Sequence, residues 1–311
     1  MSEFKAVILT NNPIAIPGIK EFLFYGKVAA ICIPKRNKEM KHILEQLLPD
    51  TGVPLLFIEK KTCHEQLKDI LVQYKPDVCL MMTFPFTIPP HILEIPAKGL
   101  INFHYGLLPQ CRGPHPILWH LLNNDEHAGI TVHIVDEGID TGPVILQEKI
   151  MIETDDTYGT MQSKLAYLAA KLAANLLKIL SYGTIIPATP QDEALSAYYE
   201  MPGAAALTIN WAEMDAGKIK RLVNACNPWN KGAGTSVNGW FIGITEVEIL
   251  DDGAETATLP GSILVCSKAE GLVVKTMDNK RLKINIIYTN EGFFSGGKMA
   301  DFQVKAGNSF I

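Results

Sequence analysis

The sequence lacks the glycine-rich turns that hold phosphate in many nucleotide-binding folds. Its first apolar run ends in TNNPIAIPG, not in Gly-x-Gly-x-x-Gly, and no Walker A loop occurs in the 311 residues. Without such a turn, the backbone amides that cradle a pyrophosphate at the start of a helix are missing. The sequence therefore disfavours a dinucleotide-dependent oxidoreductase and a nucleotide hydrolase.

The chain also has no excess of positive charge and no long apolar run. Its 28 Lys and Arg residues are outnumbered by 33 Asp and Glu residues, which gives a formal net charge of −5. This balance excludes a generally basic protein that coats nucleic acid, but it leaves room for a local basic patch. No uninterrupted apolar run reaches the roughly 18 residues that a membrane span requires. We therefore expect a soluble protein with no membrane partner.

Cysteine and histidine are present, but without a pattern that indicates a disulfide framework or a metal site. The six cysteines form no Cys-x-x-Cys pair, and Cys32 and Cys79 lie within apolar runs. Such thiols fit a reducing compartment, so the predicted location is cytoplasmic. Four of the eight histidines crowd residues 115–133, but their spacing gives no His-x-x-x-His helix face. We predict no metal cofactor.

The first part of the chain alternates strand-like and helix-like segments. Apolar residues recur with helical spacing over 38–48, 61–75 and 158–182. Short β-rich runs lie at 5–10, 28–34, 54–59, 77–82, 100–104, 130–136 and 143–150. This alternation predicts an α/β fold in which helices cover a mostly parallel sheet.

The rest of the chain has a different pattern. Residues 184–208 are rich in Pro, Ala and turn-forming residues, which indicates a linker. Beyond them, 211–225 has helical spacing, and strand-like runs occupy 240–250, 261–267, 271–277 and 281–289. Short strands separated by Gly, Asp and Asn turns predict a small barrel or sandwich. The predicted domains are 1–183 and 209–311, joined by the linker.

Three polar residues of the first domain form a pattern that suits catalysis. Asn102 and His104 are two apart on an apolar strand, so both side chains lie on one face at the strand's carboxyl end. Open α/β sheets place ligands at that end. Asp140 follows in a turn between Gly138 and Gly142. An amide, an imidazole and a carboxylate can supply an oxyanion donor, a proton-transfer group and its orienter.

Each of these signals alone has a plainer explanation. A single strand histidine is more often a packing residue, and Asp140-Thr141-Gly142 alone is more often a turn. The same three letters also occur in aspartic proteases. That enzyme class requires a second carboxylate turn or a homodimer, and the parallel-sheet pattern disfavours it.

Several short motifs together are more specific than any one of them. Residues 102–142 contain Asn102-Phe103-His104, Leu107-Leu108-Pro109, Arg112-Gly113 with Pro116-Ile117, Gly129-Ile130-Thr131, and Asp140-Thr141-Gly142. In this order they resemble the signature of the folate-dependent formyltransferase family. The resemblance extends over nearly the whole chain, and its last hundred residues are similar to the smaller domain of methionyl-tRNA formyltransferases. It implies a Rossmann-like, mostly parallel formyltransferase domain followed by a small OB-like β-barrel.

The resemblance implies transfer of a formyl group from 10-formyltetrahydrofolate to an amine, without a metal. Asn102 and His104 would stabilise the charge that grows on the formyl oxygen. Asp140 would orient the imidazole, and either His104 or a water molecule would take the amine's proton. Arg112 and Gly113 would lie where a charged acceptor or the folate tail binds.

The family's folate cleft maps onto two segments of this chain. Phe86, Ile88 and Pro89 would lie on one side of the pterin. Asp136, Glu137 and Gly138 would lie on the other, where main-chain groups provide most of the binding. Ordinary core packing explains Phe86 and Ile88 equally well. The chain departs from the family at Gly106, where many members carry Ser, so any hydrogen bond from that hydroxyl is lost.

The acceptor is less clearly indicated than the reaction. Residues 209–311 hold 11 basic and 11 acidic residues, whereas extensive phosphate contact favours net positive charge. The single basic run, KRNKEMKH at 35–42, is short, and a solvated start of a helix explains it slightly better. The favoured interpretation is a methionyl-tRNA formyltransferase-like enzyme whose acceptor has diverged from initiator tRNA. The alternatives are initiator methionyl-tRNA itself, an amino-sugar nucleotide, and a non-catalytic folate-binding module. Glycinamide ribonucleotide enzymes resemble the first domain only.

Overall fold

The computed structural model describes residues 4–182, 185–250 and 257–311. The chain divides into two compact units. We call residues 1–116, 127–151 and 162–199 the first unit, and residues 117–126, 152–161 and 200–311 the second unit. The domain boundary predicted at residues 183 and 184 lies outside the described residues.

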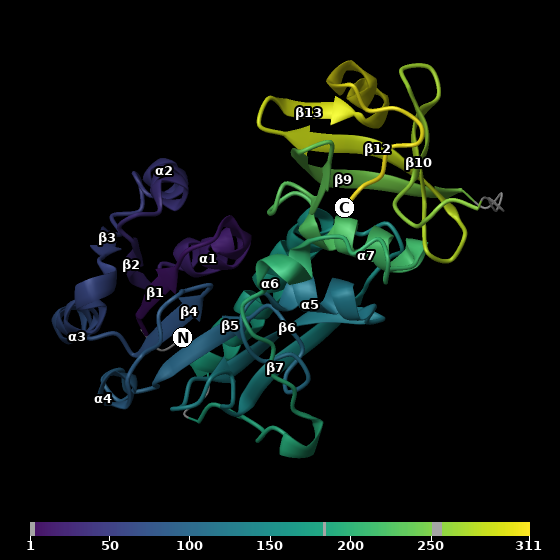
Figure 1. The fold of residues 1–311 in the computed structure, drawn as a ribbon. Helices are drawn as coiled ribbons and strands as arrows, with labels where there is room; N and C mark the ends of the chain where they lie inside the picture. The colour runs from purple at the N-terminus through teal and green to yellow at the C-terminus, as the bar shows by residue number, and fades with distance from the viewer. Residues whose placement is uncertain (1–3, 183–184, 251–256) are drawn as a thin grey trace. The chain divides into compact units, whose positions relative to one another are not determined.

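The first unit is built on a seven-stranded sheet (Figure 1). Its strands are β1 (Ala6–Thr10), β2 (Val28–Pro34), β3 (Leu55–Ile58), β4 (Val78–Met82), β5 (Leu100–His104), β6 (His127–Ile134) and β7 (Val144–Met151). The order is β3-β2-β1-β4-β5-β6-β7, with parallel pairing from β3 to β5 and antiparallel pairing of β6 and β7. The predicted mostly parallel α/β sheet is therefore confirmed. Strands β1 and β4 are almost wholly buried, which explains their continuous apolar sequences.

Helices flank these strands along the chain. They are α1 (Ile16–Phe24), α2 (Lys38–Leu47), α3 (Cys63–Tyr74), α4 (Pro90–Leu93) and α6 (Tyr158–Tyr182), with short 3₁₀ segments at Pro13–Ala15, Lys60–Thr62 and Glu193–Leu195. Helix α5 (Pro116–Asn123) follows β5 in the sequence, and all but its first residue belong to the second unit. Helix α2 begins where the Asn37 side chain accepts a hydrogen bond from the Met40 amide, a typical N-cap. The sequence patterns did not predict α1 and α5. In α1, Pro17 and Gly18 hide the helical signal, yet Pro is well tolerated in a first turn.

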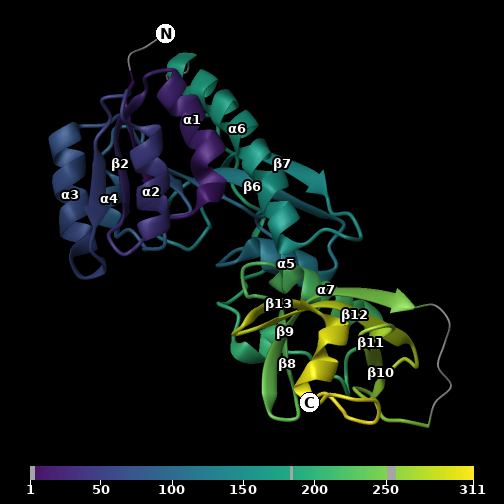
Figure 2. The same ribbon diagram turned by 90° about the horizontal axis from the view of Figure 1, so that it is seen from above.

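Helix α6 is long and apolar, and it runs beside α1 (Figure 2). The two helices are in contact at Gly18 of α1, where a Cβ would lie 3.4 Å from the Ala169 carbonyl oxygen of α6, an ordinary van der Waals distance. By length and composition alone, α6 is the one helix among the described residues that is apolar enough to cross a membrane. Half of its most apolar stretch is buried within the molecule, and core helices commonly have this property.

The second unit contains α7 (Ala216–Cys226) and an antiparallel sheet. Its strands are β8 (Ala233–Val237), β9 (Trp240–Leu250), β10 (Ile263–Ser267), β11 (Gly271–Lys275), β12 (Arg281–Thr289) and β13 (Gly292–Ser295), and 3₁₀ segments lie at Ala204–Leu207 and Gly296–Phe302. The strand order is β10-β11-β12-β9-β8, and β13 pairs with β12. The patterns did not predict β8 and β13, which are short and rich in Gly, Ser and Phe.

The last residues of the chain bridge the two outer strands of this sheet. Ile311 exchanges backbone hydrogen bonds with Ser236 of β8, at 2.9 and 3.2 Å. On the other side, the Ile263 amide donates to the Asn308 carbonyl at 2.8 Å, and the Phe310 amide donates to Gly261 at 2.9 Å. These bonds close the sheet into the small barrel that was predicted.

Candidate active site

Strand β5 presents Asn102 and His104 on one face. It lies between β4 and β6, and the register with β6 places His133 opposite Asn102 and Thr131 opposite His104. Both residues of the pair therefore have fixed neighbours across the antiparallel ladder. Because alternate residues of a strand share a face, both side chains project from the same face of the sheet.

The Asp140 carboxylate lies at the centre of this group. Its Oδ1 accepts a hydrogen bond from Asn102 Nδ2 at 3.3 Å, and its Oδ2 accepts one from the Gly113 amide at 3.0 Å. His104 Nδ1 lies 3.5 Å from Oδ2, and His133 Nε2 lies 3.5 Å from Oδ1. The structure thus brings together the three residues for which the sequence predicts catalytic roles, although their side chains come from a strand and a distant turn.

The surroundings of Asp140 favour its charged form. Burial alone would raise the pKa of this carboxyl group. The charges of His104 and His133, and the hydrogen bonds from His133 and the Gly113 amide, outweigh burial and hold the pKa of Asp140 well below its usual range. A carboxylate that stays ionised can orient an imidazole and stabilise an imidazolium, but it is a poor proton acceptor.

The imidazole of His104 has a defined orientation. Its Nε2 lies 2.7 Å from the Cys111 carbonyl oxygen, and the ring is almost completely buried. A carbonyl only accepts hydrogen bonds, so Nε2 carries a proton. In the neutral ring the lone pair is therefore on Nδ1, the nitrogen that lies 3.5 Å from Asp140 Oδ2. A proton taken up at Nδ1 would form an imidazolium 3.5 Å from a carboxylate.

The loop after β5 is tied to the neighbouring strands. The Thr131 hydroxyl donates to the Gly106 carbonyl at 2.7 Å and accepts from the Leu108 amide at 3.1 Å. Gln147 of β7 donates to the Leu108 carbonyl at 2.8 Å and to Thr131 at 2.9 Å. Gly129 has no room for a side chain, because a Cβ there would meet the Glu148 carbonyl. The Gly129-Ile130-Thr131 motif therefore holds the loop that follows His104.

Gly106 is packed against His104 itself. A Cβ at this position would lie 2.7 Å from His104 Nε2 and 2.7 Å from the Cβ of Pro116. The imidazole thus occupies the space that a side chain at residue 106 would need. The observed position of the His104 ring therefore requires glycine at residue 106, where many family members carry Ser.

Arg112 and Gly113, which the sequence predicts to bind the acceptor or the folate tail, lie beside Asp140. Gly113 adopts a left-handed backbone, and a Cβ there would meet the Tyr199 carbonyl, so glycine is required. The Arg112 guanidinium is mostly buried and forms a bidentate ion pair with Glu193. Its Nη1 donates to Oε2 at 2.9 Å and its Nη2 donates to Oε1 at 2.6 Å. These hydrogen bonds hold the pKa of Glu193 below its usual range. A role of Arg112 in ligand binding stays a prediction.

Gln191, in the predicted linker, is part of the same network and was not predicted. Its Nε2 donates to the carbonyls of Asp140 and Gly142, at 2.9 and 2.8 Å. Its Oε1 accepts from Arg112 Nη2 at 2.8 Å and from Nε at 3.2 Å. Its partners are main-chain carbonyls about fifty residues away and an arginine farther still, so no local pattern could have identified it.

His133 is the second residue that the sequence patterns missed, because its histidine cluster appeared incidental. It is buried on β6, its Nδ1 lies 2.9 Å from the Ile134 carbonyl, and Asn102 Nδ2 lies 3.2 Å from its Nε2. A neutral His133 accepts from Asn102 at Nε2, whereas a protonated one donates to Asp140. The available signal was strand alternation: an antiparallel β5–β6 pairing would have placed it opposite Asn102.

The residues predicted to contact folate occupy two segments of the first unit. Ile88 is buried in the core of the first unit. Phe86 is partly buried and packs against the same core, with its ring centroid 5.2 Å from that of Phe84. Pro89 is half-buried.

The other folate segment is a tight turn before Asp140. The Asp136 carboxylate accepts from the Gly138 amide at 3.2 Å and from the Thr141 hydroxyl at 2.6 Å. Glu137 and Gly138 are exposed. Their contact with folate stays a prediction.

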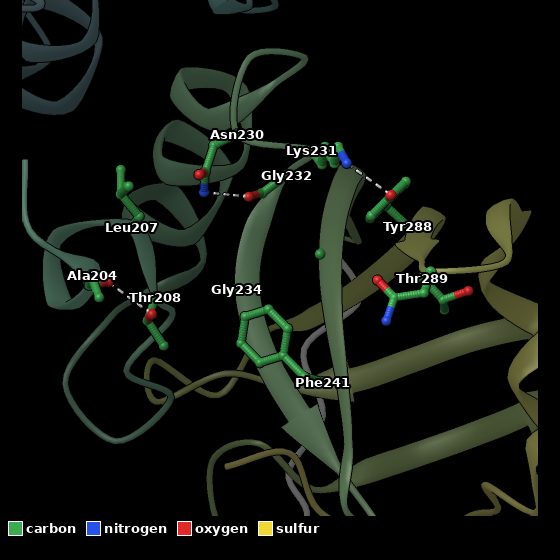
Figure 3. Close-up of a pocket in the computed structure, with 12 residues that line it drawn as sticks. Ala204, Leu207, Thr208, Asn230, Lys231, Gly232, Gly234, Phe241, Tyr288 and Thr289 are labelled. Carbon is green, nitrogen blue, oxygen red and sulfur yellow. Dashed lines mark hydrogen bonds between the residues drawn. The ribbon is translucent and has the colours of Figure 1, made fainter.

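The rest of the described chain offers no comparable centre. Among these residues, no three His, Cys, Asp or Glu side chains are grouped so as to hold a metal ion. The second unit has a separate cavity of about 380 Å³, whose wall includes Phe241, Tyr288 and Lys231 (Figure 3). The Lys231 ammonium donates to the Tyr288 hydroxyl at 3.0 Å. The residues that line this cavity include no acid–base group comparable with the Asp140 network.

The comparisons with known proteins identify the family. A family model described as formyl transferase matches residues 26–177, and a second, described as formyl transferase, C-terminal domain, matches residues 204–293. A methionyl-tRNA formyltransferase from Caldanaerobacter subterraneus subsp. tengcongensis is 31% identical over 88% of this chain and 89% of its own length. The chain belongs to the formyl transferase family. The resemblance found in the sequence motifs is confirmed.

Solved structures with the same fold include other formyltransferases. The N-formyltransferase from Helicobacter canadensis, in complex with folinic acid and dTDP-3-aminofucose, has a TM-score of 0.66 and 19% identity, and the match covers 90% of this chain and 98% of that one. HypX from Aquifex aeolicus, in complex with tetrahydrofolic acid, has a TM-score of 0.64 and 16% identity over 97% of this chain. This formyltransferase spans only about half of HypX, 48% of its length. At these identities the likeness concerns the fold.

Proposed function

We propose that this formyltransferase transfers a formyl group from 10-formyltetrahydrofolate to an amine. The observation that carries the proposal is the convergence of Asn102 and His104 on the Asp140 carboxylate. A folate donor is supported by the tetrahydrofolic acid and folinic acid in the two solved relatives. Phe86 and the exposed turn at Glu137 and Gly138 are the groups of this chain that would meet the pterin.

The proposed chemistry gives each polar residue one task. Asn102 Nδ2 donates to the formyl oxygen as the acceptor nitrogen bonds to the formyl carbon, and it exchanges one of its present acceptors for the developing oxyanion. His104 Nδ1 takes the proton that the amine loses, while the Cys111 carbonyl retains the proton on Nε2. Asp140 stabilises the resulting imidazolium. The bond from the formyl carbon to folate N10 then breaks, and N10 receives the proton.

The acceptor proposed first is an amine other than initiator methionyl-tRNA, with an amino-sugar nucleotide as the class to test. The balanced charge of residues 209–311, 11 basic against 11 acidic, disfavours an extensive phosphate-binding surface. The solved H. canadensis relative contains such a nucleotide. Methionyl-tRNA is the second candidate, because the Caldanaerobacter relative matches nearly the full chain.

The test is turnover of 10-formyltetrahydrofolate by the purified full chain with dTDP-3-aminofucose, with charged initiator tRNA, and with no acceptor. Mass spectrometry of the acceptor would detect the added formyl group. His104→Ala should lower turnover by about 10²–10⁴-fold and leave folate binding in place. Lys68→Ala, at an exposed position of α3, is the control.

Each outcome has a defined meaning. Formylation of the amino sugar supports the first acceptor, and formylation of the tRNA replaces it with the second. Unchanged turnover in the His104 variant would overturn the assigned chemistry. Folate binding without transfer to either acceptor would favour a binding module.

A further inference from the structure

Gln191 connects residues 185–199, which we call the connecting segment, to the turn that carries Asp140. We propose that Gln191 is a positioning residue for formyl transfer, acting through the backbone of the Asp140 turn. The inference rests on the proposed function, because it assigns Asp140 a part in that reaction. The contacts that carry it all lie within the first unit.

The amide of Gln191 uses its full hydrogen-bonding capacity. Nε2 has two hydrogens and donates to the carbonyls of Asp140 and Gly142, while Oε1 accepts from Nε and Nη2 of Arg112. This set also fixes which end is oxygen. A flipped amide would put its NH₂ group against the guanidinium and its oxygen against two carbonyls. No shorter or purely acceptor side chain can make the same four bonds.

The turn that Gln191 holds adopts a demanding backbone conformation. Asp140 has φ +56°, in the left-handed region that non-glycine residues seldom adopt. Gly142 approaches the Ile134 carbonyl so closely that a Cβ would collide with it. The carbonyls of these two turn residues are those that Gln191 binds. Loss of the amide would leave both without this partner and allow the turn to relax.

Gln191 also binds Arg112, which precedes the residue that binds the other side of the Asp140 carboxylate. We call the hydrogen bonds of Gln191 to Asp140, Gly142 and Arg112 the clamp. Arg112 is bound to the Gln191 oxygen, and the residue after it, Gly113, donates its amide to Asp140 Oδ2 at 3.0 Å. One glutamine therefore relates two loops to each other: the loop that supplies the carboxylate and the loop that supplies its hydrogen-bond donor. A shift of about 1 Å between reacting groups is enough to cost roughly 10²-fold in rate.

The connecting segment has other anchors that do not depend on Gln191. The Arg112 amide donates to the Ala197 carbonyl at 2.9 Å, the Tyr199 amide donates to the Arg112 carbonyl at 2.9 Å, and the Ala197 amide donates to the Pro109 carbonyl at 3.1 Å. A substitution at Gln191 therefore removes the clamp and leaves the segment attached. We therefore expect a variant at Gln191 to fold.

The decisive substitution is Gln191→Glu, which keeps the size and the acceptor for Arg112 but removes both donors to the turn. We expect kcat to fall by about 10–100-fold, with a smaller change in the KM of the formyl donor. Hydrogen exchange of the peptide 136–143 should become faster. Gln46→Glu makes the same chemical change at an exposed position of α2 and should leave both quantities unchanged.

The outcomes separate this inference from the proposed function. An active wild-type enzyme with unchanged kcat and unchanged exchange in Gln191→Glu would overturn the clamp. A wild-type chain that formylates no acceptor would overturn the proposed function, while the exchange measurement still tests the clamp. Circular dichroism would establish that the variant is folded. If it is not, Gln191→Met, which introduces no charge, is measured in its place.

Discussion

A methyl group added at Gly106 should disturb His104 directly. A Cβ there would be 2.7 Å from His104 Nε2 and from the Pro116 Cβ, whereas carbon atoms in contact are normally about 3.5–4.0 Å apart. Both the ring and the proline must therefore move away from the added carbon, by roughly 1 Å. The hydrogen bond from Nε2 to the Cys111 carbonyl is 2.7 Å long, and such a movement would break it.

The expected cost of Gly106→Ala has two parts. Overpacking a core position costs about 1–3 kcal/mol, and a lost internal hydrogen bond adds about 1 kcal/mol. In a domain of this size, each kcal/mol lowers Tm by about 2–4 °C. Thermal unfolding should therefore show a fall of roughly 4–16 °C, and turnover should fall because the imidazole tautomer is no longer fixed.

A matched glycine makes this prediction specific. Gly203 has φ −79° and no heavy atom within 4 Å of its Cβ position, so Gly203→Ala should leave Tm unchanged or raise it slightly. An equal response of the two variants would refute the reasoning, because it would show that the packing at His104 has no special cost. Wild-type Tm and wild-type turnover in Gly106→Ala would refute it as well.

Two further substitutions test the network around His104. Asp140→Asn should destabilise the protein at neutral pH. The depressed pKa of Asp140 means that its carboxylate stabilises the folded state above the unfolded pKa of about 3.9, and that this stabilisation is lost progressively as the pH falls below that value. Denaturant titrations at pH 7 and pH 3 should show the difference from wild type shrinking in acid, and a constant difference would contradict the assignment. Thr131→Val should cost about 1–3 kcal/mol, because it removes the hydroxyl that binds the Gly106 carbonyl and the Leu108 amide, and chemical unfolding at neutral pH would measure it.

The sequence predicted those parts of the site that follow from local periodicity. Alternation along β5 was enough to place Asn102 and His104 on one face, and the Gly-flanked turn indicated Asp140. The seven strands of the first unit were predicted within a few residues. The buried parallel strands β1 and β4 have continuous apolar sequences. The resemblance to the family indicated the reaction and the two-domain architecture.

The remaining features depend on contacts that local sequence does not encode. The role of His133 follows from the register of β5 and β6, and that of Gln191 from main-chain carbonyls about fifty residues away. Helix α5 follows a loop that contains Gly and Pro, which hides its beginning. The barrel of the second unit is closed by backbone bonds of the last four residues, whose side chains show no clear strand pattern.

The location of Asp140 explains why residues outside β5 and the Asp140 turn should affect the reaction. Its carboxylate is held by Asn102 and the Gly113 amide, and its backbone is held by Gln191. A buried charge is stable only if its hydrogen-bonding partners remain in place, because unpaired charge is costly away from water. Any change that releases one of these partners must shift the carboxylate, its pKa or the imidazole of His104. Substitution of Gln191 should therefore have the kinetic effects of an active-site substitution, although the connecting segment carries none of the family's catalytic motifs.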